Sequence, residues 1–98
     1  MNDTPALDNL IHQPTRLRIM AALAAMELDA EVDFTFLRKS LHLSDGNLGS
    51  HLEKLEAAGY IQLRKAFIAR KPKTFIQLTR RGRRSFEEHV EALRRIVG

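Results

Sequence analysis

Several residue types and patterns are missing from this 98-residue chain, and each absence narrows its class. It has no cysteine, which excludes a disulfide framework, a thiolate zinc site and a thiol redox switch. No stretch approaches the roughly 18 apolar residues of a membrane span, and the polar start Met1–Thr4 does not resemble a signal peptide. We therefore expect a single cytoplasmic domain over residues 1–98, with no membrane partner.

Acidic residues are absent from residues 57–86, although this segment carries nine Lys and Arg. The formal net charge of +4 therefore leaves −5 on the other residues (4 − 9 = −5). A block of one sign predicts a nucleic-acid-facing surface, because neutralised phosphates release condensed counterions. The alternative is a solvated loop without function. The nine cations are Arg64, Lys65, Arg70, Lys71, Lys73, Arg80, Arg81, Arg83 and Arg84.

Motifs for catalysis, cofactors or metals are also missing. The five glycines are spaced as turn and packing residues rather than as a phosphate-binding loop, and no nucleophile motif is present. The histidines at 12, 42, 51 and 89 have no metal-ligand spacing and are interpreted as isolated surface or cap residues. We expect no enzyme activity, no metal and no cofactor.

The first long helix is predicted over 14–28, because Pro14 suits the first turn of a helix. A shorter helical piece is expected over 6–11. The long helix has two apolar faces, one expected to meet the core and the other a partner. The first face contains Leu17, Met20, Ala21 and Ala24, and the second contains Ile19, Leu23 and Met26.

A helix-turn-helix is predicted next. A very short strand at 32–34 leads into a helix over 34–41, for which Asp33 or Thr35 is a suitable N-cap. Leu43 is expected to fill the turn, and Ser44 to cap a second helix over 45–58. Leu48, Leu52 and Leu55 repeat at helical spacing and fix the inward face of that second helix.

The opposite face of this second helix carries small, hydrogen-bonding or cationic groups, as a helix in a major groove requires. Many solvated helix faces have a similar composition, so the face gains its meaning from the neighbouring cations. Gly49 lies beside it and gives a low backbone profile. The exposed set is Asn47, Ser50, His51 and Lys54.

A hairpin and a final helix complete the chain. Two apolar, β-branched runs predict strands within 60–78, with a cationic tip at 69–73 stiffened by Pro72. Such a tip is suited to reach a phosphate backbone or the adjoining minor groove. Thr79 is expected to cap a helix over 79–97 whose apolar residues repeat at helical spacing. Arg80, Arg81, Arg83 and Arg84 crowd the first turns of this helix and oppose its macrodipole, an electrostatic cost that a bound anion would relieve.

The order of these elements is that of a winged helix-turn-helix, a mainly α fold with a small β-hairpin (α+β). The run from Leu43 to Ile61, with Lys65, Pro72-Lys73-Thr74 and the run Leu78 to Arg83, resembles small prokaryotic winged-helix transcriptional regulators of the broad MarR/ArsR-like group. The resemblance covers about 7–97. It implies a homodimeric double-stranded DNA-binding repressor or regulator, with 45–58 as the recognition helix and 65–73 as the wing. It implies dimer contacts through the terminal helices. The sequence leaves a small-molecule effector possible and does not identify it.

These patterns give three sets of predicted site residues. The recognition-helix set is Ser44, Asn47, Ser50, His51 and Lys54, and the wing set is Arg64, Lys65, Arg70, Lys71 and Lys73. The dimer-interface set is Leu10, Ile19, Leu23, Phe86, Val90, Leu93 and Val97. The alternative function is a winged-helix module for protein interaction or DNA architecture, because the fold alone does not define the partner.

Overall fold

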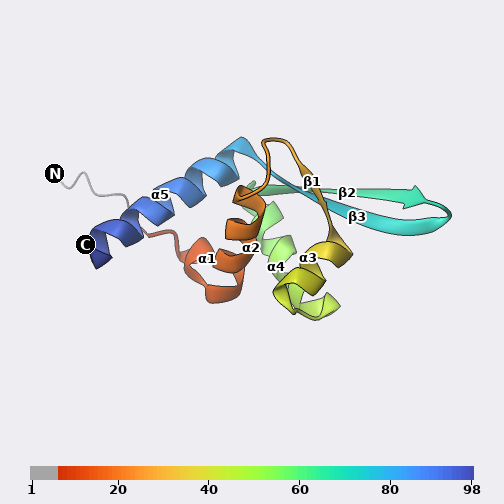
Figure 1. The fold of residues 1–98 in the computed structure, drawn as a ribbon, viewed down its shortest axis with the longest axis horizontal. Helices are drawn as coiled ribbons and strands as arrows, with labels where there is room; N and C mark the ends of the chain where they lie inside the picture. Colours follow the sequence, from red (N-terminus) through yellow and green to blue (C-terminus); the bar gives the residue numbers. More distant parts are fainter. Residues whose placement is uncertain (1–6) are drawn as a thin grey trace.

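The computed structural model describes residues 7–98. Residues 1–6, which include the polar start Met1–Thr4 and the first residue of the helical piece predicted over 6–11, lie outside the described residues. The helices and strands follow in the order α1 Asn9–His12, α2 Pro14–Ala24, β1 Glu31–Asp33, α3 Phe34–Leu41, α4 Asp45–Ala57, β2 Ile61–Ile68, β3 Lys71–Leu78 and α5 Arg80–Val97. The predicted fold class, a winged helix-turn-helix of α+β type, is confirmed. In Figure 1 the β2–β3 hairpin projects to one side of the helices, and α5 extends to the other. No helix within residues 7–98 is long and apolar enough to cross a membrane.

Local capping explains where several helices begin and end. The side chain of Asp33 accepts a hydrogen bond from the backbone N–H of Phe36 and thereby starts α3. His42 ends α3 in the left-handed region, with φ of 56°. Gly59 follows α4 with φ of 80°, a conformation that glycine adopts without steric cost. The predicted caps and the glycine signal therefore act as the sequence indicated.

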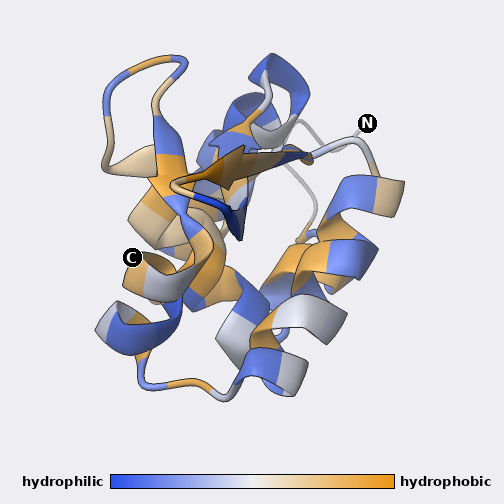
Figure 2. Cartoon of the chain, turned by 90° about the vertical axis from the view of Figure 1, so that its right-hand side faces the viewer, coloured by the Kyte–Doolittle hydropathy of each residue, from blue (hydrophilic) through white to orange (hydrophobic). Residues whose placement is uncertain are grey.

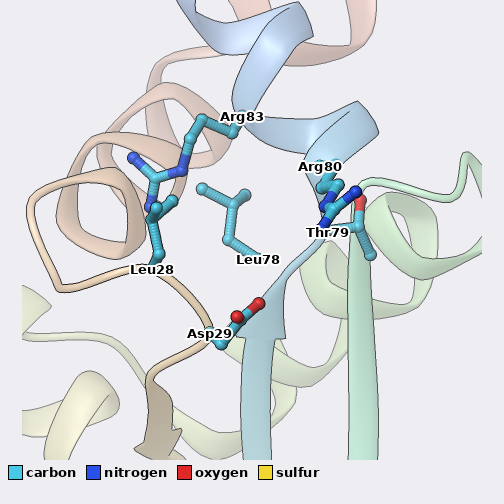
Figure 3. Close-up of a pocket in the computed structure, with 6 residues that line it drawn as sticks. All are labelled: Leu28, Asp29, Leu78, Thr79, Arg80 and Arg83. Atoms are coloured by element: carbon cyan, nitrogen blue, oxygen red, sulfur yellow. The ribbon is translucent and has the colours of Figure 1, made fainter.

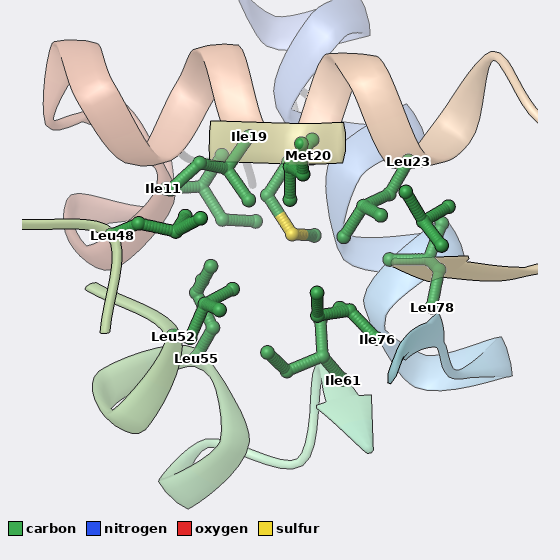
Figure 4. Packing of buried hydrophobic residues seen from close by; sticks show 12 residues of the cluster. Ile11, Ile19, Met20, Leu23, Leu48, Leu52, Leu55, Ile61, Ile76 and Leu78 are labelled. Carbon is green, nitrogen blue, oxygen red and sulfur yellow. The ribbon is translucent and has the colours of Figure 1, made fainter. Parts of the chain in front are cut away.

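The sheet has three antiparallel strands in the order β1-β3-β2. Ile61 pairs with Leu78, and Leu63 pairs with Ile76, so these four side chains lie on one face of the sheet. Leu48, Leu52 and Leu55 of α4 pack on that face together with residues of α1 and α2 (Figure 4). Figure 2 shows that hydrophobic and hydrophilic residues alternate along the helices. The core therefore fixes α4 against one face of the hairpin's base.

Two predictions about α2 are wrong. The helix ends at Ala24 rather than at residue 28. Ile19 and Leu23, predicted to face a partner, are 0% and 3% exposed and point into the core in Figure 4. The physical reason is that α1, α4, α5 and the sheet all pack around α2, so both of its apolar faces are needed within one chain.

The hairpin also differs from the prediction. β3 begins at Lys71 and includes Pro72, so the expected loop over 69–73 is a two-residue turn. Ala69 and Arg70 form that turn with φ of 52° and 65°. Positive φ at both central residues is what a type I′ hairpin turn requires. The wing is consequently a longer and stiffer ribbon than its composition suggested.

Candidate nucleic-acid interface

The exposed face of α4 is built by the burial of its opposite face. Leu48, Leu52 and Leu55 are all buried, which turns the side containing Asn47 and Ser50 toward solvent. A methyl group added at Gly46 or Gly49 would meet nothing within 4 Å outside its own helix backbone. Within the described chain, the backbone of α4 is therefore open to close approach at these glycines. Asn47, Ser50 and Lys54 are exposed, as predicted for residues that contact a partner.

Ser44 begins α4. Its Oγ accepts a hydrogen bond of 3.1 Å from the backbone N–H of Asn47. Asp45 lies in the first turn, where the macrodipole favours an acid, and its carboxylate is 2.9 Å from Nε of Arg38 in α3. Ser44 therefore caps the start of α4, and both Ser44 and Asn47 are exposed at that end of the helix.

His51 is held by a residue that the sequence analysis did not identify. Nη1 of Arg16 in α2 lies 3.2 Å from Nδ1 of His51, and Nε of Arg16 donates to the carbonyl of Leu10 at 2.6 Å. A guanidinium only donates, so Nδ1 must accept and the neutral ring carries its proton on Nε2. Burial lowers the pKa of His51 from 6.5, and the charges of Arg16 and Lys54 lower it further. At neutral pH this imidazole therefore presents an Nε2–H donor.

The wing cations fall into two groups. Lys65, Arg70 and Lys71 are exposed and make no ion pair with any residue of 7–98. Arg64 donates to the Glu31 carboxylate at 2.7 Å and lies 4.7 Å from the centre of the Phe75 ring. Nζ of Lys73 is 4.0 Å from Oδ1 of Asp33. Arg64 therefore ties the hairpin to β1, and three wing cations remain without an acidic neighbour.

The four cations at the start of α5 are not one cluster with the wing. Nη1 of Arg83 donates to the carbonyl of Ala24 at 3.1 Å, at the C-terminal end of α2. The guanidinium of Arg81 lies 5.9 Å from the centre of the Tyr60 ring. In Figure 1 this end of α5 lies above the hairpin, whereas α3 and α4 lie below it. Arg81 and Arg83 thus have partners within the chain, so these contacts explain why both residues lie there without a bound anion.

The prediction of isolated histidines is wrong for two of the four. His89 in α5 is completely buried, and its Nε2 lies 3.4 Å from Nδ1 of His12. The backbone N–H of Asp8 donates to Nδ1 of His89 at 3.1 Å, and the hydroxyl of Tyr60 donates to the Asp8 carboxylate. This cluster joins α1 to α5. It has a structural role in packing, and no group of three potential metal ligands was found anywhere in 7–98.

A small cavity lies between the α2–β1 connection and the start of α5 (Figure 3). Its volume is about 80 Å³. Binding sites for drug-sized ligands measure roughly 300–1,000 Å³, so this cavity is too small for such an effector. Its lining residues are Leu28, Asp29, Leu78, Thr79, Arg80 and Arg83.

The residues predicted for a dimer contact do not form one surface. Ile19 and Leu23 belong to the core, and Leu10 and Phe86 are partly buried against it. Val90 borders a groove of about 210 Å³ along α5, together with Phe86, Glu87, Glu91 and Arg94. Val97 is 84% exposed at the end of the helix. Of the predicted set, only Val90, Leu93 and Val97 of α5 lie outside the core and the side chains packed against it.

Comparison with known proteins places this geometry in a family. Residues 15–97 match the family model described as "Winged helix DNA-binding domain". An uncharacterized protein of Methanocaldococcus jannaschii is 35% identical over 81 residues, which cover 83% of this chain and 85% of that protein. The chain belongs to the winged helix DNA-binding domain family.

Two solved structures show the same architecture. The transcriptional regulator homologue protein from Pyrococcus horikoshii OT3 superposes with a TM-score of 0.82 and 29% identity, covering 92% of this chain and 86% of that one. The transcriptional regulator BldR from Sulfolobus solfataricus gives a TM-score of 0.63 at 22% identity, covering 93% of this chain and 58% of that one. The second similarity concerns the fold alone.

Proposed function

We propose that this protein is a sequence-specific double-stranded DNA-binding transcriptional regulator that acts as a repressor. The observation that carries the proposal is the uncovered polar face of α4 beside a wing with three unpaired cations. Family membership and the similarity to the Pyrococcus regulator homologue support it. The residue runs noted above favour the MarR/ArsR-like group, which we retain as part of the proposal.

In this proposal α4 enters the major groove. The Asn47 amide is suited to an adenine edge, because it donates and accepts together. The Nε2–H of His51 is suited to a guanine acceptor or a phosphate, with Arg16 holding the ring. Ser44, Ser50 and Lys54 supply the remaining contacts. Lys65, Arg70 and Lys71 neutralise phosphates, and Arg64 and Lys73 act through the position of the hairpin.

We further propose a homodimer that contacts through the outer face of α5. Val90, Leu93 and Val97 lie on that face at helical spacing, and Val97 is 84% exposed. Two copies would place their recognition helices about 34 Å apart, one turn of B-DNA, and would bind a pseudo-palindromic site.

The test of DNA binding measures affinity for duplexes against salt concentration. For six to ten phosphate contacts, log affinity should fall with log salt at a slope of roughly −5 to −9. Replacing Arg70, Lys71 and Lys73 together by Ala should weaken binding to all sequences and flatten the slope. The matched control replaces Arg80 and Arg84, which are exposed at the start of α5, and should leave the slope unchanged. A slope near zero for the unaltered protein would contradict DNA binding and favour a protein partner.

A further inference from the structure

We propose that the tip of the hairpin carries an apolar wedge, Phe67 backed by Pro72, which enters the minor groove and unstacks a base step of the bound duplex. This inference rests on the proposed DNA-binding function and adds the residue that would deform the DNA. Phe67 is 80% exposed, although burial of an aromatic side chain is strongly favourable. It stands at the most distant part of the wing, where it contributes nothing to the core.

The register of the hairpin places Phe67 directly opposite Pro72. The two-residue turn makes Ile68 and Lys71 the hydrogen-bonded pair, so Phe67 and Pro72 form the next, non-hydrogen-bonded pair. Side chains approach most closely in such a pair. The missing N–H of Pro72 also costs nothing there, because that position points away from β2 and β1 pairs only with residues 75–77. The result is a stiff apolar pair at the tip.

The wedge lies on the DNA-facing side in the proposed binding mode. Successive residues of a strand alternate between faces, so Phe67 shares a face with Ile61 and Leu63. These are the residues of β2 that continue the core on which α4 packs. Ile68, which is 47% exposed, lies on the opposite face. The strand thus presents two apolar residues side by side, only one of which faces the side of α4.

The length of the hairpin matches the step between grooves. From Gln62, at the base of β2, to Phe67 the strand advances roughly 17 Å at about 3.3 Å per residue. Half a turn of B-DNA, which separates a major groove from the adjoining minor groove, is also about 17 Å. With α4 in the major groove, the tip therefore reaches the neighbouring minor groove.

The charges around the wedge select its partner. Lys65 shares the face of Phe67, and Arg70 and Lys71 flank the tip, with no ion pair to any residue in the described chain. Contact between two such tips would bring cations against cations, which argues against self-association through Phe67. A polyanion accommodates the cations and the ring together. Minor-groove proteins use apolar wedges beside cationic residues to kink the duplex.

The experiment compares the unaltered protein with Phe67→Ala, using Ile68→Ala as the matched control on the other face. The probe is a preferred duplex that carries end-to-end fluorescence labels to report bending. A 2-aminopurine in the adjoining minor-groove region reports unstacking. The unaltered protein should bend the duplex and raise the 2-aminopurine signal. Phe67→Ala should lose both signals and about tenfold to a hundredfold in affinity, while keeping the salt slope, because every cation remains.

Each other outcome has a defined meaning. Bending and unstacking that persist in Phe67→Ala would overturn the wedge and leave DNA binding intact. Equal losses in Ile68→Ala would overturn the assignment to Phe67. An unaltered protein that binds without bending also overturns the wedge, and one that binds no duplex overturns the proposed function itself. If Phe67→Ala binds too weakly to measure, Phe67→Leu decides the matter: partial bending supports the wedge, and full bending overturns it.

Discussion

Gly82 lies in the first turns of α5, where the helix crosses the backbone of Tyr60. A Cβ at this position would lie 2.1 Å from the carbonyl oxygen of Tyr60 and 2.8 Å from its carbonyl carbon. The crossing is fixed by Thr79, whose N–H donates to Tyr60 at 3.0 Å and whose hydroxyl donates to Gly59 at 2.7 Å. The two nearest atoms belong to the backbone, and Cδ1 of Leu78 follows at 2.9 Å, so α5 itself would have to move.

Gly82→Ala should destabilise the protein by about 1–3 kcal/mol, the usual cost of overpacking. This reverses the ordinary effect of such a change, since Ala is favoured over Gly in a helix by roughly 0.5–1 kcal/mol. The control is Gly46→Ala in α4, where a methyl group meets open space and should stabilise the fold by about that amount. Urea unfolding measures both free energies. Stabilisation by Gly82→Ala would contradict the close crossing.

The His89 side chain is held as a neutral group. Burial lowers its pKa from 6.5 and the charge of His12 lowers it further, while the charge of Asp8 acts in the opposite direction. The unfolded chain therefore binds more protons than the folded chain below pH 6.5, and stability must decrease as the pH falls through that value. Burial raises the pKa of Asp8, but the bonds from Tyr60, Ile11 and Leu10 outweigh it and leave the pKa below 3.8. The decrease in stability caused by protonation of Asp8 therefore occurs only at lower pH.

Between pH 7 and pH 5 the free energy of unfolding should fall in the unaltered protein, and it should fall less steeply in His89→Leu. Part of the slope should remain, because the pKa of His51 is also lowered. His42→Gln, which removes an exposed histidine at the end of α3, is the control. Denaturant unfolding at a series of pH values gives the measurement. Identical slopes for the unaltered protein and His89→Leu would show that His89 does not govern this window.

At the scale of the elements, Gly49 affects helix stability and the proposed DNA contact of α4 in opposite ways. Gly49→Ala should stabilise the helix by roughly 0.5–1 kcal/mol, because the residue lies in its interior and a methyl group meets nothing within 4 Å. The same methyl group would stand between the backbone and a base edge. Affinity for the preferred DNA site should therefore fall about tenfold, roughly 1.4 kcal/mol, and affinity for random DNA should change little. Unchanged affinity for the preferred site would mean that this part of α4 does not approach bases.

Local signals made much of the fold predictable. The caps at Asp33, Ser44 and Thr79, the leucine spacing of α4 and the left-handed Gly59 depend on neighbours within a few residues. Pro72 misled the prediction of the hairpin, because proline disfavours strands except at a position like this, where its N–H is not needed.

Contacts between distant residues were not predictable from the sequence. Arg16 with His51, Glu31 with Arg64, and His12 with His89 are separated by 35, 33 and 77 positions. The spacing of apolar residues indicates that a residue lies on an apolar face of a helix, but it does not indicate which element packs against that face. Ile19 and Leu23 were assigned to a partner for this reason. The exposed α4 residues were predictable, because burial of one helix face determines the other.

For the whole molecule, the proposed homodimer depends on the outer face of α5. Val97→Asp together with Leu93→Asp should split the dimer, because carboxylates would be buried without partners in an apolar contact. Val97 is 84% exposed within one chain, so its replacement leaves the monomer core intact. Leu28→Asp, at an exposed position before β1, is the matched control. Sedimentation equilibrium should show a dimer for the unaltered protein and for Leu28→Asp, and a monomer for the double variant of α5. DNA affinity should fall only for the double variant.

The opposed projection of wing and α5 gives the chain extents of 55 × 23 × 22 Å (Figure 1). Its radius of gyration is 14.3 Å, whereas a compact domain of this length has one of about 12.5 Å. An elongated body experiences more friction than a sphere of the same mass. The 11.2 kDa monomer should therefore elute early from a gel-filtration column and tumble anisotropically, with slower reorientation about its short axes than about its long one.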